Sequence, residues 1–169
     1  TISSALSSNG KVIVTGCLGK DSDTIKKSYP KVLAVTGPSE PTKVLRAVQK
    51  AYPKTGKPLR NFLSPAGIKL TPKHYSYLKI SEGCNHSCQF CIIPDLRGRL
   101  ISRQMDLILQ EAEDLVKIGT KELLVISQDT SAYGLDLKHP IQSKKPANIL
   151  NLCEALGNLG IWIRLHYLY

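Results

Sequence analysis

The chain has 169 residues, of which 42% are hydrophobic and 21% are charged. These proportions are typical of a globular protein and exclude a disordered polyelectrolyte. No apolar run approaches the roughly 20 residues that a membrane-spanning helix needs, so we expect no membrane partner. The opening residues, Thr1 to Ser4, include no Met, basic stretch or apolar core. We therefore expect no targeting segment and a chain that continues upstream.

The net charge of +10 is concentrated in the first part of the chain. Residues 1–74 carry 13 Lys and Arg against 3 Asp and Glu, whereas residues 75–169 carry 10 against 10. A basic segment of this kind favours an anionic partner such as RNA or a ribonucleoprotein. A solvated, lysine-rich surface explains the same charge equally well, so charge alone leaves proximity to rRNA open.

Residues 1–53 alternate between short β-branched runs and helical patterns. In chain order, the expected elements are a strand over 12–14, a helix over 21–28, a strand over 31–35 and a helix over 44–51. This alternation predicts a small α/β unit. The following stretch, 54–69, contains several Gly and Pro residues and is typical of a linker.

Residues 70–169 repeat the alternation on a larger scale. The expected elements are a strand over 75–80, a helix over 105–116, a strand over 123–126, a helix over 149–156 and a strand over 161–168. The run 123–126 is apolar throughout, as in a parallel sheet covered on both faces. Strands joined by helix-length crossovers predict an α/β fold, the first half of a (β/α) barrel that stops at its third strand. An unpaired strand edge there indicates a truncated chain.

Three cysteines, Cys84, Cys88 and Cys91, stand within eight residues directly after the first of these strands. Three thiolates on one loop can ligate three irons of a four-iron cluster and leave the fourth iron open to a small molecule. The loop follows the carboxyl end of a strand, where parallel α/β folds bind ligands. Five cysteines without a signal peptide also favour metal binding in a reducing compartment over disulfides.

Zinc is the main alternative for this loop, because His86 could complete a four-ligand site with the three cysteines. Structural zinc sites usually use two separated ligand pairs, so the short spacing favours an iron–sulfur cluster. A non-catalytic zinc or iron–sulfur module is therefore the alternative of a different functional class.

The motif Cys84-x3-Cys88-x2-Cys91, with Phe90 before its last cysteine, resembles the signature of radical S-adenosylmethionine (SAM) enzymes. In that family, the open iron binds SAM and one electron from the cluster cleaves it to a 5′-deoxyadenosyl radical. The stretches 82–103 and 127–134 are similar to the methylthiotransferase branch. The second stretch resembles enzymes that modify an aspartate of small-subunit ribosomal protein twelve. A tRNA methylthiotransferase is the nearest alternative.

The resemblance implies roles for individual residues. The three cysteines of the motif would hold the radical-generating cluster, and Cys17 would ligate a second [4Fe-4S] cluster whose other ligands lie upstream. Phe90 would pack near the adenine of SAM, with simple core filling as the alternative. Gln128 and Asp129 would contact cofactor or substrate, with turn formation as the alternative. Cys153 lies on an apolar helical face and is expected in the core.

For the complete protein, the resemblance implies a transferase that adds a methylthio group to the β-carbon of the target aspartate. Two [4Fe-4S] clusters, SAM and an electron donor would take part, and the ribosomal protein or subunit would be the partner in the cytoplasm. Residues 1–53 would belong to the methylthiotransferase N-terminal domain, and 70–169 would be a truncated radical SAM core. The chain alone is therefore expected to be inactive. Arg97, Arg99 and Arg103 could receive carboxylate or phosphate groups, although surface pairing with Asp95 or Asp106 is the commoner outcome.

Overall fold

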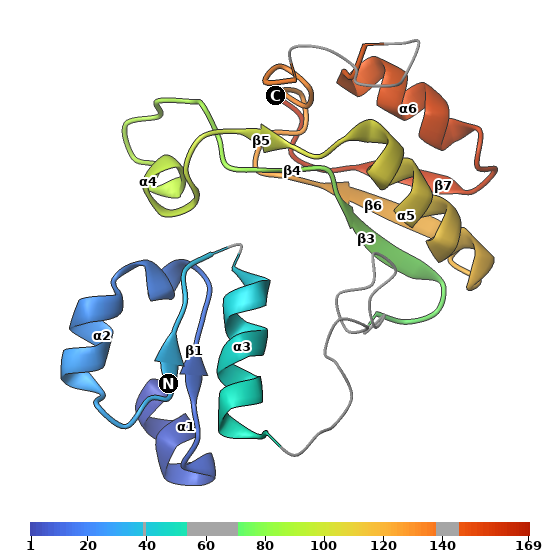
Figure 1. Ribbon diagram of the computed structural model, residues 1–169. Coiled ribbons are helices and arrows are strands. Elements are labelled where there is room, and N and C mark those ends of the chain that lie inside the picture. The colour runs from blue at the N-terminus through green and yellow to red at the C-terminus, as the bar shows by residue number, and fades with distance from the viewer. Residues whose placement is uncertain (39, 54–70, 138–145) are drawn as a thin grey trace. The chain divides into compact units, whose positions relative to one another are not determined.

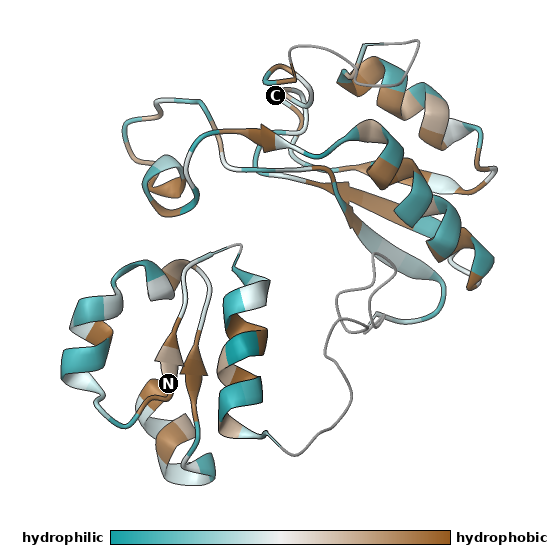
Figure 2. Ribbon diagram, viewed as in Figure 1, coloured by the Kyte–Doolittle hydropathy of each residue, from teal (hydrophilic) through white to brown (hydrophobic). Residues whose placement is uncertain are grey.

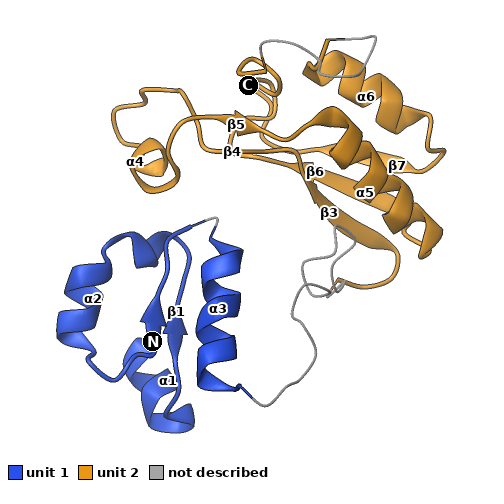
Figure 3. Ribbon diagram, in the orientation of Figure 1, with its two compact units in different colours: residues 1–61 blue, residues 62–169 orange. Residues whose placement is uncertain are grey.

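The computed structural model describes residues 1–38, 40–53, 71–137 and 146–169. The chain divides into two compact units, 1–61 and 62–169 (Figure 3). The predicted linker over 54–69 lies outside the described residues. None of the described helices combines the length and apolarity that a bilayer crossing needs.

The first unit builds a two-stranded parallel sheet among helices (Figure 1). Its elements are α1 (Ile2–Asn9), β1 (Ile13–Val14), the 3-10 helix η1 (Cys17–Lys20), α2 (Ser22–Ser28), β2 (Ala34–Val35) and α3 (Pro41–Ala51). β1 and β2 pair in register, with Ile13 opposite Ala34. The predicted strands and helices are present, although the strands are shorter than expected. The sequence did not predict α1 or η1.

The second unit contains a three-stranded parallel sheet in the order β3-β6-β7. Its elements are β3 (Tyr75–Lys79), β4 (Ser81–Glu82), α4 (Ile93–Arg97), β5 (Ile101–Ser102), α5 (Met105–Lys117), β6 (Glu122–Ile126), α6 (Ile149–Gly157) and β7 (Trp162–Leu165). Parallel pairing places Leu78 opposite Val125 and Leu123 opposite Ile163. The prediction of a partial (β/α) barrel is confirmed. The short antiparallel pair of β4 and β5 was not predicted.

Helices α5 and α6 lie side by side against one face of this sheet (Figures 1 and 2). The core there consists of fully buried side chains from strands and helices, including Leu78, Leu123, Val125, Ile108 and Leu152. Alternate residues of the strands point to the opposite face because successive side chains on a strand alternate.

No helix that the structure describes in the second unit packs on that opposite face. Tyr77 is 52% exposed, and Lys79 and Ile126 line a cavity there. Within the second unit, helices α5 and α6 cover one face of the run 123–126, and the expected cover of its other face stays a prediction. Leu123 and Val125 of this run pack in the core with the helices, and Ile126 on the other face lines the cavity.

Candidate functional site

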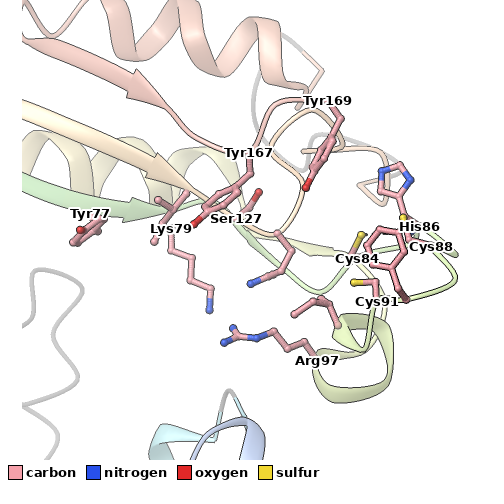
Figure 4. A pocket seen from close by; sticks show the side chains of 14 residues that line it. Tyr77, Lys79, Cys84, His86, Cys88, Cys91, Arg97, Ser127, Tyr167 and Tyr169 are labelled. Atoms are coloured by element: carbon pink, nitrogen blue, oxygen red, sulfur yellow. Dashed lines mark hydrogen bonds between the residues drawn. The ribbon is translucent and has the colours of Figure 1, made fainter.

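A cavity of about 720 Å³ lies at the carboxyl ends of the three parallel strands (Figure 4). It is large enough for a cofactor-sized ligand. Its walls come from β3 and the segment after it, including α4, from the end of β6 and the loop that follows, and from the last residues of the chain. Parallel strands carry ligand sites at this edge because the loops that follow them converge there.

The segment 83–91, here called the cysteine loop, is held by hydrogen bonds to the residues 98–100 that follow α4. Cys84 donates its backbone N–H to the Gly98 carbonyl at 3.1 Å, and the Asn85 side chain accepts from the Leu100 N–H at 3.1 Å. Gly83 has φ of +78°, and a Cβ there would lie 2.1 Å from the Arg99 carbonyl oxygen. Only glycine fits this close approach.

All three predicted cysteines line the cavity. Cys84 is buried at 8% exposure, Cys91 is half-buried and Cys88 is exposed. The backbone N–H of His86 lies 3.4 Å from the Cys84 sulfur and donates to it. Hydrogen bonds to ligating sulfurs tune the reduction potential of an iron–sulfur cluster. Three thiols from one loop facing one cavity therefore fit the ligand set of a cluster.

The zinc alternative receives no comparable support from the described residues. No three His, Cys, Asp or Glu side chains converge there on a point that a single ion could occupy. His86, the expected fourth zinc ligand, has its Nε2 atom 2.7 Å from Asp129 Oδ2. This ring nitrogen therefore already has a carboxylate oxygen as its hydrogen-bond partner.

The loop after β6 is bonded directly to the cysteine loop. Gln128 Oε1 accepts the backbone N–H of Gly83 at 2.7 Å, and Asp129 contacts His86 as described. Asp129 is 4% exposed, and its Oδ1 also accepts the Ala132 N–H at 3.2 Å. Asp129 therefore makes the turn that was the alternative prediction and, in addition, orients a residue of the cysteine loop.

Sequence similarity assigns the chain that forms this site to a protein family. The Radical SAM superfamily matches residues 78–166, more than half of the chain. The chain belongs to the radical SAM superfamily. Membership implies SAM and a [4Fe-4S] cluster as cofactors.

Individual radical SAM relatives are similar over the whole of this chain. Proteins named "Ribosomal protein uS12 methylthiotransferase RimO" are 56% identical in Nitrosomonas europaea, 57% in Paracoccus denitrificans and 56% in Bartonella tribocorum. The matches cover 99–100% of this chain but 36–39% of the relatives. The chain thus spans about two fifths of the length of these relatives.

Within the radical SAM unit, the remaining predicted residues take different places. Phe90 lines the cavity at 95% exposure, which contradicts the core-filling alternative; its contact with adenine stays a prediction. Gln128 also lines the cavity. Cys153 is half-buried on α6, beside the fully buried Leu152, and burial raises the pKa of its thiol.

Cys17 belongs to the first unit, where it begins η1. Gly16 precedes it with φ of +83°, so the chain turns sharply after β1 and presents a half-buried thiol at the end of that strand. This position suits a ligand supplied by a loop, and the role of Cys17 stays a prediction.

Several features of the site were not predicted from sequence. The expected surface pairs with Asp95 and Asp106 are not among the contacts of the arginines: Arg97 instead contacts Glu82 at 2.6 Å, and Arg103 contacts Glu111 at 2.6 Å. Arg103 precedes α5, and its partner Glu111 lies on that helix, eight residues further along the chain. Alternation along β3 is the one sequence signal that could have placed Lys79 with Tyr77 in the cavity.

Proposed function

We propose that the full-length protein is a radical SAM methylthiotransferase that adds a methylthio group to the β-carbon of an aspartate in ribosomal protein uS12. One observation carries the proposal: the two stretches that resemble methylthiotransferases are hydrogen-bonded to each other at one cavity, through Gln128 and Gly83. The names of the similar proteins support the substrate. The ribosomal subunit would be the partner, close to rRNA and in the cytoplasm.

The residues of this chain would position the reactants. The three thiolates of the cysteine loop would hold one [4Fe-4S] cluster, and Cys17 would hold a second together with cysteines upstream. When bound, the clusters and SAM supply the radical, sulfur and methyl group that modification of an unactivated carbon requires. The exposed ring of Phe90 offers a flat surface to adenine. Gln128 fixes the loop and faces the same space, and Asp129 acts through His86 as a positioning residue.

The proposal also assigns the parts of the chain. Residues 1–53 would be the C-terminal part of a methylthiotransferase N-terminal domain, 54–69 a linker and 70–169 a truncated radical SAM core. Because the second cluster needs further ligands, this chain would be inactive without the rest of the protein. An external electron donor would reduce the clusters.

The test uses the full-length protein, reconstituted with iron and sulfide without oxygen. It is incubated with SAM, a reductant and either unmodified small ribosomal subunits or unmodified tRNA. We expect a methylthio mass gain on one aspartate of uS12, and none with a Cys88→Ala variant. A gain on tRNA alone would establish the tRNA alternative. Tightly bound zinc without iron–sulfur absorption or any mass gain would instead indicate a non-catalytic module.

A further inference from the structure

Two cationic side chains enter the cavity from different elements. Lys79 ends β3 on the open face of the sheet, and Arg97 ends α4; Figure 4 shows both side chains directed into the same space. No Asp or Glu is among the lining residues that the structure describes. The charged part of this wall is therefore positive.

Glu82 holds the two cations in place from outside the lining. Its Oε1 accepts from Arg97 Nη1 at 2.6 Å, and its Oε2 pairs with Lys79 Nζ. The Glu82 side chain is 15% exposed, whereas those of Arg97 and Lys79 are 31% and 44% exposed. An ammonium has three N–H donors and a guanidinium has five. After pairing with Glu82, both groups keep donors for a ligand in the cavity.

The two cations also repel each other across this space. Burial and, next, the Arg97 and Arg103 guanidinium groups lower the pKa of Lys79. Glu82 offsets only one of the two positive charges, so an anionic ligand in the cavity would neutralise the second and could hydrogen-bond to both side chains. A carboxylate is suited to this role because its two oxygens can accept from two separate donors.

We propose that Lys79 and Arg97 form a subsite that binds the side-chain carboxylate of the target aspartate. The inference rests on the proposed function and names how that site grips its substrate. Two contacts to the carboxylate would fix the adjacent β-carbon, from which hydrogen is removed. Holding the reacting carbon in one orientation lowers the entropic part of the barrier.

SAM also carries a carboxylate, but the family resemblance assigns that group to the open iron of the cluster. The pair formed by Lys79 and Arg97 is carried by β3 and α4, not by the cysteine loop itself. A second carboxylate in the cavity is the one that the target aspartate brings. If Lys79 binds the carboxylate of SAM, changing it should lower SAM cleavage without uS12. If Lys79 binds the carboxylate of the target aspartate, that cleavage should be unchanged.

The test compares full-length Lys79→Met, Lys79→Arg and Lys117→Met. Lys79→Met keeps the aliphatic stem but removes the charge, and Lys79→Arg restores a cation. Lys117 is the matched control because it lies on the surface of α5 and pairs with Asp114. Each enzyme is assayed with uS12 that carries Asp or Asn at the target position. SAM cleavage to 5′-deoxyadenosine is also measured without uS12.

We expect Lys79→Met to lower kcat/KM for the Asp substrate by about tenfold to one hundredfold, the loss typical of one hydrogen bond to a charged group. The preference for Asp over Asn should shrink, substrate-free SAM cleavage should stay at the wild-type rate, and Lys79→Arg should recover part of the activity. Lys117→Met should match wild type.

Three results would overturn the subsite. They are unchanged kinetics in Lys79→Met, an equal loss with Asp and Asn substrates, and a fall in substrate-free cleavage that assigns Lys79 to SAM. Wild-type enzyme that leaves uS12 unmodified would contradict the proposed function itself, which separates the two failures.

Discussion

The side-chain oxygen of Gln128 accepts a hydrogen bond from the backbone N–H of Gly83 at 2.7 Å, across 45 residues of sequence. Gln128 follows β6, and Gly83 opens the cysteine loop directly after β4, the short strand that follows β3. β3 and β6 are adjacent parallel strands, so this bond joins the carboxyl ends of neighbouring strands at the cavity. The position of the first proposed cluster ligand, Cys84, therefore depends on a side chain of another loop.

Replacing Gln128 with Ala should loosen the cysteine loop without unfolding the protein. The Gly83 N–H loses its acceptor, which costs about 1–3 kcal/mol when the donor is left unsatisfied. We expect the reconstituted full-length variant to lose iron to a chelator about tenfold faster than wild type. Gln128→Glu keeps an oxygen that can accept the bond and should retain most of the cluster. Equal rates of iron loss in Gln128→Ala and wild type would show that the bond does not support the loop.

Gly83→Ala should prevent assembly of the cluster in the cysteine loop. Its Cβ would lie 2.1 Å from the Arg99 carbonyl oxygen, so the backbone must move. Gly119→Ala is the matched control, because Gly119 also has positive φ, at +98°, a Cβ there meets no atom within 4 Å, and this glycine follows α5, away from the cysteine loop. The control should cost about 1–3 kcal/mol from strain alone and still bind iron. Normal iron and sulfide content in Gly83→Ala would contradict this account of the loop.

The cysteines of the apoprotein should differ in their rates of alkylation. Cys88 is exposed. Burial raises the pKa of the Cys153 thiol, which disfavours the reactive thiolate. We expect Cys88 to react at least about tenfold faster than Cys153, as measured by mass spectrometry of peptides after brief treatment with iodoacetamide. Comparable alkylation rates at Cys88 and Cys153 would contradict the burial of the Cys153 thiol.

Tyr133 should make the stability of the second unit sensitive to alkaline pH. Burial is the main cause that raises its pKa to about 12, with Asp136 and Asp106 adding to it and Arg103 opposing it. Its hydroxyl donates to the Arg103 carbonyl at 3.0 Å. Because the folded pKa lies above the unfolded value of about 10, the neutral phenol contributes stability below pH 10. That contribution is lost as the pH rises from about 10 to 12.

The rise in the pKa of Tyr133 from 10.0 to about 12 corresponds to about 3 kcal/mol of stability. Urea unfolding of the full-length apoprotein and its Tyr133→Phe variant would measure it. Near pH 8, the variant should be about 1 kcal/mol less stable, because it lacks one hydrogen bond. Between pH 10 and 12, wild type should lose more stability than the variant. Parallel curves over that range would contradict the raised pKa.

Much of the radical SAM fold could be predicted from the sequence because its long elements have clear periodicity. The apolar spacing along 105–116 and the continuous run 123–126 correspond to α5 and β6. Short elements were missed for a physical reason: β4 and β5 have two residues each, and tertiary pairing with each other rather than local preference defines them. An apolar run also does not reveal whether a helix or a cavity faces it, so the exposure of Ile126 to the cavity could not be predicted.

The candidate site was predictable where ligands are close in sequence and unpredictable where contacts are distant. Cys84, Cys88 and Cys91 are visible as a motif, and the structure places all three on the cavity. The pairing of His86 with Asp129 joins loops 43 residues apart. Such a contact requires the β3–β6 register, which no local pattern specifies.

The central claim is that the cysteine loop holds a cluster with one iron open to SAM. Electron paramagnetic resonance of the reduced, full-length Cys17→Ala variant tests it most directly, because this account leaves that variant with the cysteine-loop cluster alone. Addition of SAM should change the cluster signal and release 5′-deoxyadenosine, and Cys88→Ala should show neither effect. A cluster signal that SAM leaves unchanged, or stoichiometric zinc in place of iron, would contradict the claim.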